Sequence, residues 1–388
     1  MHLLSFFVIL SSLPTAETFT YICNQSESRT KLHSEREDPS SREEESYLTM
    51  NQLKTLSQLQ GRILPIVLSK TVPQLTSQCY KGSSGRIGIL GGSEKYTGAP
   101  YYAAMSALRT GADLATVFCA DEACIAIKSY SPELMVNGVY SAHRMQSSDE
   151  SVRQNEVTNM VNSVTNSLDR LHVLVIGPGL GRDPAVMDAT AQIIREARRK
   201  SINLVLDADA LFLLSLEDYH DLLLNNEDYN ASQESAFVLT PNVVEYQRLV
   251  DSVGNGSEDC FRRKLTKDTV VVKKGCHDVI ERCLSHESKQ KDTKETIMIC
   301  EEKGGLKRSG GIGDILAGSI GTFVAWNQIL SKQGAATDLV ISCWMASSLT
   351  KRSTKAAFDK RKRSMTAPDI LDEIGAVVHE VTSSTLRL

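Results

Sequence analysis

A glycine-rich loop followed by one carboxylate is the stretch of this sequence best suited to chemistry. Gly310, Gly311 and Gly313 precede Asp314, and the apolar residues of 315–326 recur with the period of a helix. Glycines in front of a helix leave backbone N–H groups free to converge on an anion, and the helix dipole strengthens their attraction. The layout favours phosphoryl transfer, with main-chain donors for the charge and Asp314 as the base. The alternative is a flexible loop with an ordinary helix-capping Asp.

Two pairs of charged residues directly follow short apolar runs. Asp207 and Asp209 end one run, and Lys273 and Lys274 end another. Alternate positions at a strand end point to opposite sides, so we expect only one of the two aspartates to face a site. A metal pair and a helix cap are both open for these aspartates. One of the lysines could reach a phosphate as a point charge, and a solvated pair is the alternative.

Asn242 and Glu245 lie three residues apart at a predicted helix start. This spacing lets both side chains face the same cleft. Magnesium keeps much of its hydration and accompanies nucleotide phosphates, so Glu245 is a candidate to hold Mg²⁺ through water. A solvated capping Glu is the alternative.

A glycine turn at 177–181 resembles a dinucleotide-binding fingerprint only in part. The third glycine is missing at the required spacing, where Arg182 stands instead. A Rossmann-type oxidoreductase is therefore disfavoured. We expect this turn to let a substrate approach the backbone closely.

Apolar runs that alternate with helical patterns must position these residues. The sequence predicts strands at 86–90, 114–119, 173–176, 204–206, 237–239, 269–272 and 297–300. It predicts a helix with Pro100 in its first turn that stops at Gly111, and another capped by Asp183 with Pro184 at its first position. Strands joined through helices indicate a parallel sheet, whose ligands bind at the carboxyl ends of the strands.

Composition excludes several classes of protein. The 388 residues are 41% hydrophobic and carry a net charge of -4, which offers no basic field for nucleic acid. The nine cysteines include no Cys-x-x-Cys pair, so neither zinc nor a disulfide framework is expected. A reducing compartment, the cytoplasm first, fits this cysteine usage.

The N-terminus differs in character from the rest of the chain. Residues 3–13 are apolar but too few to span a bilayer, and no Lys or Arg precedes them. A cleaved signal or mitochondrial targeting segment and a non-functional segment are both open. Residues 25–46 are polar and predicted to be disordered, so 1–46 form a leader and 47–388 one catalytic domain. Within that domain, polar residues 285–294 suggest a surface hairpin extension.

Several motifs in order carry a resemblance to a known superfamily. The runs 310–314, 239–242 with Glu245, and 207–210 resemble the ribokinase-like superfamily. Segments 85–92, 96–101 and 130–134 are similar, more narrowly, to eukaryotic ATP-dependent NAD(P)H-hydrate dehydratases. The resemblance implies a three-layer α/β/α sandwich with a mostly parallel central sheet.

The resemblance also implies an activity and a site. The family phosphorylates the ring hydroxyl of the S epimer of hydrated NADH or NADPH with ATP, accompanied by Mg²⁺, and then expels phosphate to regenerate the reduced coenzyme. Asp314 would be the catalytic base. The hydrate would be held by Asp314, Gly179, Asn242, Val243, Val244, Glu245, Tyr246, Gln247 and Arg248. ATP would be held by Lys274, Gly275, Cys276, His277, Asp278, Gly304, Gly305, Leu306, Lys307, Arg308, Ser309, Gly310, Gly311, Ile312 and Gly313.

Two departures from the family pattern concern the site. Val243 stands where the family often has His, which puts a substrate contact in doubt, and Ile312 stands where Gln is common. A small-molecule kinase of the same fold and a catalytically silent nucleotide-binding module remain alternatives. The expected partners are small molecules, without nucleic acid or membrane, and the resemblance is compatible with a homo-oligomer.

Overall fold

The computed structural model of this chain describes residues 71–223, 235–266, 269–283, 297–335 and 338–383. All of them belong to one compact unit, Val67–Leu388. The predicted leader 1–46, the predicted start of the folded domain at Tyr47 and the polar extension 285–294 lie outside the described residues.

A nine-stranded sheet, counted over the described residues, forms the centre of this unit. Its order is β3-β2-β1-β4-β5-β6-β7-β8-β9. Pairings from β3 through to β7 are parallel, and β7–β8 and β8–β9 are antiparallel. The strands are β1 (Arg86–Leu90), β2 (Leu114–Ala120), β3 (Met135–Tyr140), β4 (Val173–Ile176), β5 (Asn203–Leu206), β6 (Phe237–Leu239), β7 (Thr269–Lys273), β8 (Asp278–Arg282) and β9 (Ile297–Cys300).

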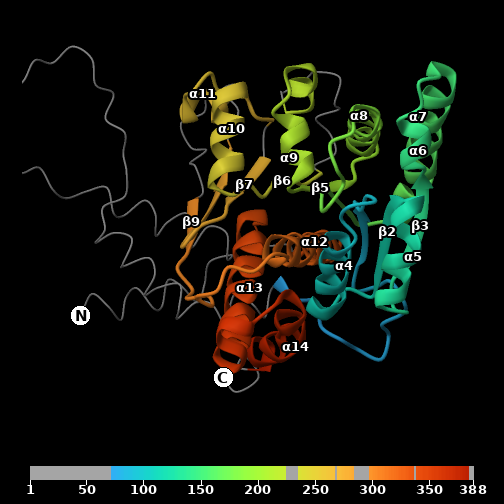
Figure 1. Cartoon of the computed structure of the whole chain (residues 1–388). Helices are drawn as coiled ribbons and strands as arrows, with labels where there is room; N and C mark the ends of the chain where they lie inside the picture. The colour runs from blue at the N-terminus through green and yellow to red at the C-terminus, as the bar shows by residue number, and fades with distance from the viewer. Residues whose placement is uncertain (1–70, 224–234, 267–268, 284–296, 336–337, 384–388) are drawn as a thin grey trace, which may run out of the picture. The chain divides into compact units, whose positions relative to one another are not determined.

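Helices cover both faces of the sheet, as Figure 1 shows. One face carries α4 (Gly98–Thr110), α12 (Ile312–Ser331), α13 (Leu339–Arg361) and α14 (Ala367–Ser383). The other carries α7 (Glu150–Thr165), α8 (Pro184–Arg199), α9 (Asp209–Leu214), α10 (Val243–Val253) and α11 (Glu258–Lys264). Two further helices, α5 (Asp121–Tyr130) and α6 (Ala142–Met145), flank β3, and short 3₁₀ turns span Leu168–Arg170, Glu217–Leu222 and Lys362–Ser364. The three-layer sandwich is confirmed.

Central strands are apolar at every position because helices bury both of their faces. All four residues of β4 are buried, and so are all four of β5. Parallel strands covered on two sides read as continuous hydrophobic runs, which is why the sequence located them.

Close packing against α4 fixes the direction of α12. A Cβ on Gly318 would lie 1.9 Å from the carbonyl oxygen of Ala103, so only glycine permits this approach. Thr322 Oγ1 donates to the Ala107 carbonyl at 3.1 Å, and Trp326 Nε1 donates to the Ser84 carbonyl at 2.8 Å. The first turn of α12 is therefore held rigidly at the carboxyl edge of the sheet.

Every predicted strand is present, with bounds within one residue. The helix ending at Gly111 and the cap of α8 are also confirmed, since Asp183 accepts from the amides of Ala185 and Val186. Strands β3 and β8 were missed. Strand β3 lies at the sheet edge with Asn137 and Gly138 exposed, and β8 begins and ends on charged residues, so neither reads as an apolar run. Within the described ranges, no helix is long and apolar enough to cross a membrane.

Candidate active site

The first turn of α12 is built as the loop pattern predicted. Gly311 precedes it in the left-handed region at φ 92°, and no side chain caps the helix. A Cβ at Gly311 would meet Ala367 Cβ at 2.7 Å and Tyr102 Cδ2 at 2.8 Å, so glycine is required twice over. The first amides of α12 are thus left to a ligand, with Asp314 beside them.

A cluster of charges lies next to this turn. Lys274 Nζ is 2.7 Å from Asp207 Oδ1 and 3.8 Å from Glu245 Oε2, and Thr240 Oγ1 donates to Asp207 at 2.8 Å. A Cβ built on Gly313 would lie 3.5 Å from Lys274 Nζ. Of the two lysines, Lys274 is therefore the one that faces the first turn of α12. The Lys273 ammonium lies instead over the ring of Tyr246.

Burial and neighbouring charges bring the pKa of Asp314 close to neutral pH. Removal from water and, next in size, the negative charge of Asp207 raise the pKa of its carboxyl to about 7, against the lowering effect of Lys274. Burial also raises the pKa of Glu245, against the lowering effect of Lys274. A carboxyl with a pKa close to operating pH is suited to act as a general base.

The two predicted aspartates have different surroundings, and the prediction that only one of them faces the site stays a prediction. Asp207 is buried against Lys274, whereas Asp209 lines a large cavity. Between them Ala208 adopts φ 48°, which breaks the alternation of a strand before α9 begins. The alternation of side chains between the two sides of a strand therefore applies only as far as Leu206, the last residue of β5.

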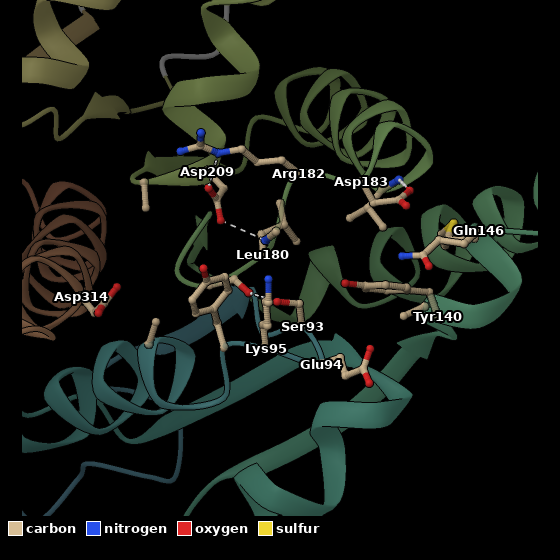
Figure 2. Close-up of a pocket in the computed structure, with 18 residues that line it drawn as sticks. Ser93, Glu94, Lys95, Tyr140, Gln146, Leu180, Arg182, Asp183, Asp209 and Asp314 are labelled. Carbon is tan, nitrogen blue, oxygen red and sulfur yellow. Dashed lines mark hydrogen bonds and ion pairs between the residues drawn. The ribbon is translucent and has the colours of Figure 1, made fainter.

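A cavity of about 1050 Å³ opens on one side of Asp314. Figure 2 shows Asp314 at one end of it and Tyr140 and Gln146 at the other. The cavity is lined by Ser93, Glu94, Lys95, Tyr96, Ala99, Tyr140, Ala142, Met145, Gln146, Gly179, Leu180, Gly181, Arg182, Asp183, Val186, Ala208, Asp209 and Asp314. Of the predicted substrate residues, Gly179 and Asp314 are among these.

Gly179 is confined by the loop that faces it. Its φ is 64°, and a Cβ there would lie 2.9 Å from both Tyr96 Cβ and the Tyr96 carbonyl oxygen. Ser93 Oγ donates to the Gly179 carbonyl at 2.9 Å. The glycine turn and the loop after β1 therefore form one continuous wall of the cavity.

A second cavity, of about 320 Å³, lies on the other side of the first turn of α12. Its lining includes eleven of the predicted ATP residues: Lys274, Gly275, Cys276, His277, Asp278, Gly304, Gly305, Leu306, Arg308, Ile312 and Gly313. Lys307, Ser309, Gly310 and Gly311 are not part of that lining. Ser309 Oγ is nevertheless buried without a partner among the described residues, which leaves an unsatisfied polar group for a ligand oxygen.

Helix α13 holds the loops of this second cavity in place. Lys351 Nζ donates to the carbonyls of Gly275 at 3.1 Å and Cys276 at 2.9 Å, and lies 3.2 Å from Asp278 Oδ1. One turn on, Thr354 Oγ1 accepts from the Gly305 amide at 3.0 Å. Sequence reasoning missed both residues, because they stand in a long helix far from the motifs they support.

The segment 242–248 is arranged around a helix cap. Asn242 accepts from the amides of Val244 and Glu245, and Glu245 Oε2 accepts from the Asn242 amide at 2.8 Å. Glu245 therefore caps the helix, as the alternative for it held, but its side chain is only 18% exposed and its carboxylate also faces Lys274. Val243 and Val244 are 64% and 67% exposed, so their side chains are free to meet a ligand.

Tyr246 departs from its predicted place. Its side chain is 2% exposed, donates to Glu258 Oε2 at 3.1 Å and packs edge-on against Phe261. Lys273 Nζ lies 3.8 Å from the centre of the same ring. The Tyr246 side chain therefore faces the core beneath α10 and not either cavity, because it falls on the inner stripe of an amphipathic helix.

The distal wall of the large cavity was not found from sequence. Tyr140, Ala142, Met145 and Gln146 come from the end of β3 and from α6, which carry no recognisable motif. The loop 93–96 carried a usable signal, since it follows a glycine pair at the end of β1. Its position at the carboxyl edge of the sheet was a sufficient reason to predict that this loop lines the site.

The fold is that of the ribokinase-like α/β proteins. A ribokinase-like superfamily protein from Enterococcus faecalis superimposes with a TM-score of 0.58 at 20% identity, covering 82% of this chain and 94% of that one. A structure from Bacillus subtilis, described as an ADP/ATP-dependent NAD(P)H-hydrate dehydratase co-crystallised with ATP and Mg²⁺, gives 0.56 at 18%, covering 82% and 97%.

The chain belongs, more narrowly, to the NAD(P)H-hydrate dehydratase family. The family model of that description matches residues 87–376. An ATP-dependent (S)-NAD(P)H-hydrate dehydratase from Aedes aegypti is 39% identical over 312 residues, which cover 80% of this chain and 82% of its own length. The human protein of the same description is 37% identical over 315 residues, covering 79% and 80%.

Proposed function

We propose that this chain dehydrates the S epimer of hydrated NADH and NADPH at the expense of ATP and so regenerates the reduced coenzyme. One observation carries the proposal beyond the family assignment. Asp314 lines the large cavity, while its neighbour Gly313 lines the smaller one. A hydroxyl in the first and a terminal phosphate in the second would therefore meet at the first turn of α12.

The first step is transfer of the terminal phosphoryl group. The ring hydroxyl oxygen attacks the terminal phosphorus of ATP, the bond from that phosphorus to the ADP oxygen breaks, and the hydroxyl proton passes to Asp314. The amides of Gly311 to Gly313 and the Lys274 ammonium face the charge on the moving group. The side chains are placed before reaction, because α12 is packed rigidly against α4.

The second step is elimination. Hydroxide is a poor leaving group, whereas phosphate is a good one, so phosphorylation makes cleavage of the ring C–O bond feasible. The lone pair of the ring nitrogen helps to expel phosphate, and a proton leaves the adjacent ring carbon. The ring double bond returns, and the oxidation state of the coenzyme is unchanged.

Mg²⁺ would accompany ATP, as it does in the Bacillus subtilis neighbour. Among the described residues no group of three or more His, Cys, Asp or Glu could hold a metal ion unaided. Glu245, facing Lys274, fits a carboxylate that binds hydrated Mg²⁺ through water while phosphate oxygens complete the shell. The ion would neutralise charge on the phosphates of ATP.

The remaining substrate contacts are assigned by the same scheme. The hydrate would contact Gly179 and Asp314 in the large cavity. The exposed side chains of Val243 and Val244 at the start of α10 would be further contacts. ATP would occupy the smaller cavity, against the turn 274–278 and the loop 304–313.

A coupled assay tests the function. Purified protein is given hydrated NADH and ATP, and the absorbance band of reduced nicotinamide is followed together with ADP release. The dehydratase restores the band with one ADP per coenzyme. Release of ADP with stable phosphorylated hydrate would instead reveal a kinase, and binding of ATP without either product a silent module.

A further inference from the structure

Two guanidinium groups share one aromatic ring close to the large cavity. The Arg182 guanidinium carbon lies 4.1 Å from the centre of the Phe212 ring, and that of Arg248 lies 5.7 Å from the same centre. Arg182 follows the glycine turn, Phe212 belongs to α9 and Arg248 to α10. Three elements thus place two positive charges beside one aromatic ring, and of the two arginines Arg182 lines the large cavity.

One carboxylate orients Arg182. Asp209 Oδ1 accepts from Arg182 Nε at 2.9 Å, and its other oxygen accepts from the Gly181 amide at 2.9 Å. The Arg182 side chain is 52% exposed, whereas that of Asp209 is 15% exposed. In Figure 2 Arg182 and Asp209 lie together along one border of the cavity. The Nε contact and the ring fix the plane of the guanidinium, so its terminal amino groups are presented without further ordering cost.

The remaining donors of this pair have no protein acceptor. Over the described ranges, the terminal amino groups of Arg182 make no hydrogen bond or ion pair, and neither does the Arg248 guanidinium. Asp209 binds Arg182, and the carboxylate of Glu245 interacts electrostatically with Arg248. The unused terminal donors of Arg182 favour an oxyanion with several acceptor oxygens, and phosphate matches the fork of a guanidinium.

We propose that Arg182 binds a phosphate group of the hydrated dinucleotide. Through this contact Arg182 is a specificity-determining residue for the reaction. The inference rests on the proposed function for the identity of the ligand. Asp314 marks the reacting ring at one end of the cavity, and Arg182 holds the phosphate end of the same molecule. Arg182 then discriminates the intact dinucleotide from a hydrated nicotinamide nucleoside, which has the reacting ring but no phosphate.

The test compares Arg182→Met with wild type. Methionine keeps apolar cover over Phe212 and removes only the charged donors. We expect the KM for both hydrated coenzymes to rise about tenfold, the effect of one lost charge-assisted contact, while the KM for ATP changes by less than about twofold. The hydrated nicotinamide nucleoside should be used equally poorly by both proteins. The matched control is Arg199→Met, an exposed arginine of α8 paired with Glu196, which should change none of these values.

A binding measurement separates this inference from the proposed function. Calorimetric titration of hydrated NADPH without ATP needs no turnover, so it remains decisive if the repair assay fails. A larger loss for NADPH hydrate than for NADH hydrate assigns the contact to the 2′-phosphate, and an equal loss assigns it to the bridging pyrophosphate. Unchanged affinity of Arg182→Met for both hydrates overturns the proposal.

Discussion

Asp314 combines three properties that seldom coincide in one carboxyl group. It is placed in the first turn of a helix, it lines the large cavity, and its pKa is raised to about 7 by burial and by Asp207. A helix N-terminus stabilises a carboxylate, so the raised pKa reflects burial and like charge that outweigh the dipole. A carboxyl with this pKa would suit the base that we propose.

Replacing Asp314 by Asn removes the proposed base while preserving shape. We expect turnover to fall by about two to four orders of magnitude, the usual range for a lost general base. The affinity for ATP, measured by titration, should stay near that of wild type because the smaller cavity is lined by other groups. Turnover close to wild type would exclude the role given to Asp314.

The pH dependence of the reaction should report the same carboxyl. Because the pKa of Asp314 is about 7, the group is ionised and able to accept a proton above that pH and is protonated below it. We expect kcat/KM for the hydrate to decline about tenfold per pH unit below neutrality. A profile that stays flat down to about pH 5, measured with saturating ATP, would contradict this assignment.

At the scale of elements, α13 supports the loops of the smaller cavity. Lys351 and Thr354 reach two separate loops from adjacent turns of this helix. The Lys351 ammonium is buried and has both main-chain and carboxylate acceptors, so its loss leaves two carbonyls without this donor and Asp278 with the Gly275 amide but without its cation. The geometry of the loops therefore depends on a residue outside them.

Lys351→Met should weaken ATP binding selectively. We expect the KM for ATP to rise about tenfold or more, with the KM for the hydrate within about twofold of wild type, since the large cavity does not contact this helix. Lys355→Met is the matched control, because Lys355 is exposed one turn later and pairs only with Asp359 among the described residues. Equal changes in both KM values would point to general unfolding, which thermal melting would reveal.

At the scale of the whole molecule, His172 couples stability to pH. Burial, with a smaller contribution from the charge of Arg86, lowers the pKa of His172 to about 4, and its Nδ1 accepts from the Arg86 amide at 3.2 Å. The folded pKa lies below the ordinary value, so the unfolded chain binds a proton first as pH falls. The stabilising effect is complete above about pH 6.5 and is lost between about 6.5 and 4.

His172→Asn keeps an acceptor near the Nδ1 position but does not titrate. Between pH 7 and pH 5, wild type should lose about 2 kcal/mol more unfolding free energy than this variant. Urea denaturation at the two pH values measures the difference. If both proteins lose the same amount, the neutral ring is not what links β4 to β1 across this pH range.

Local patterns determined much of this protein from sequence alone. The strands, the capped helices and the glycine cradle before Asp314 follow from short-range physics: burial on both faces, capping chemistry and the freedom of glycine. The edge at which ligands gather follows from parallel topology, because the carboxyl ends of parallel strands meet there.

Tertiary structure decided which of these groups act together. Asp207 and Lys274 are distant in sequence yet 2.7 Å apart, Lys351 supports a turn that no spacing connects to it, and Tyr246 is withdrawn into the core from the middle of a motif. The two cavities that meet at α12 exist only after the helices and loops pack around the edge of the sheet. Long-range contacts depend on how whole elements pack, and packing is a property of the assembled chain that no local pattern encodes.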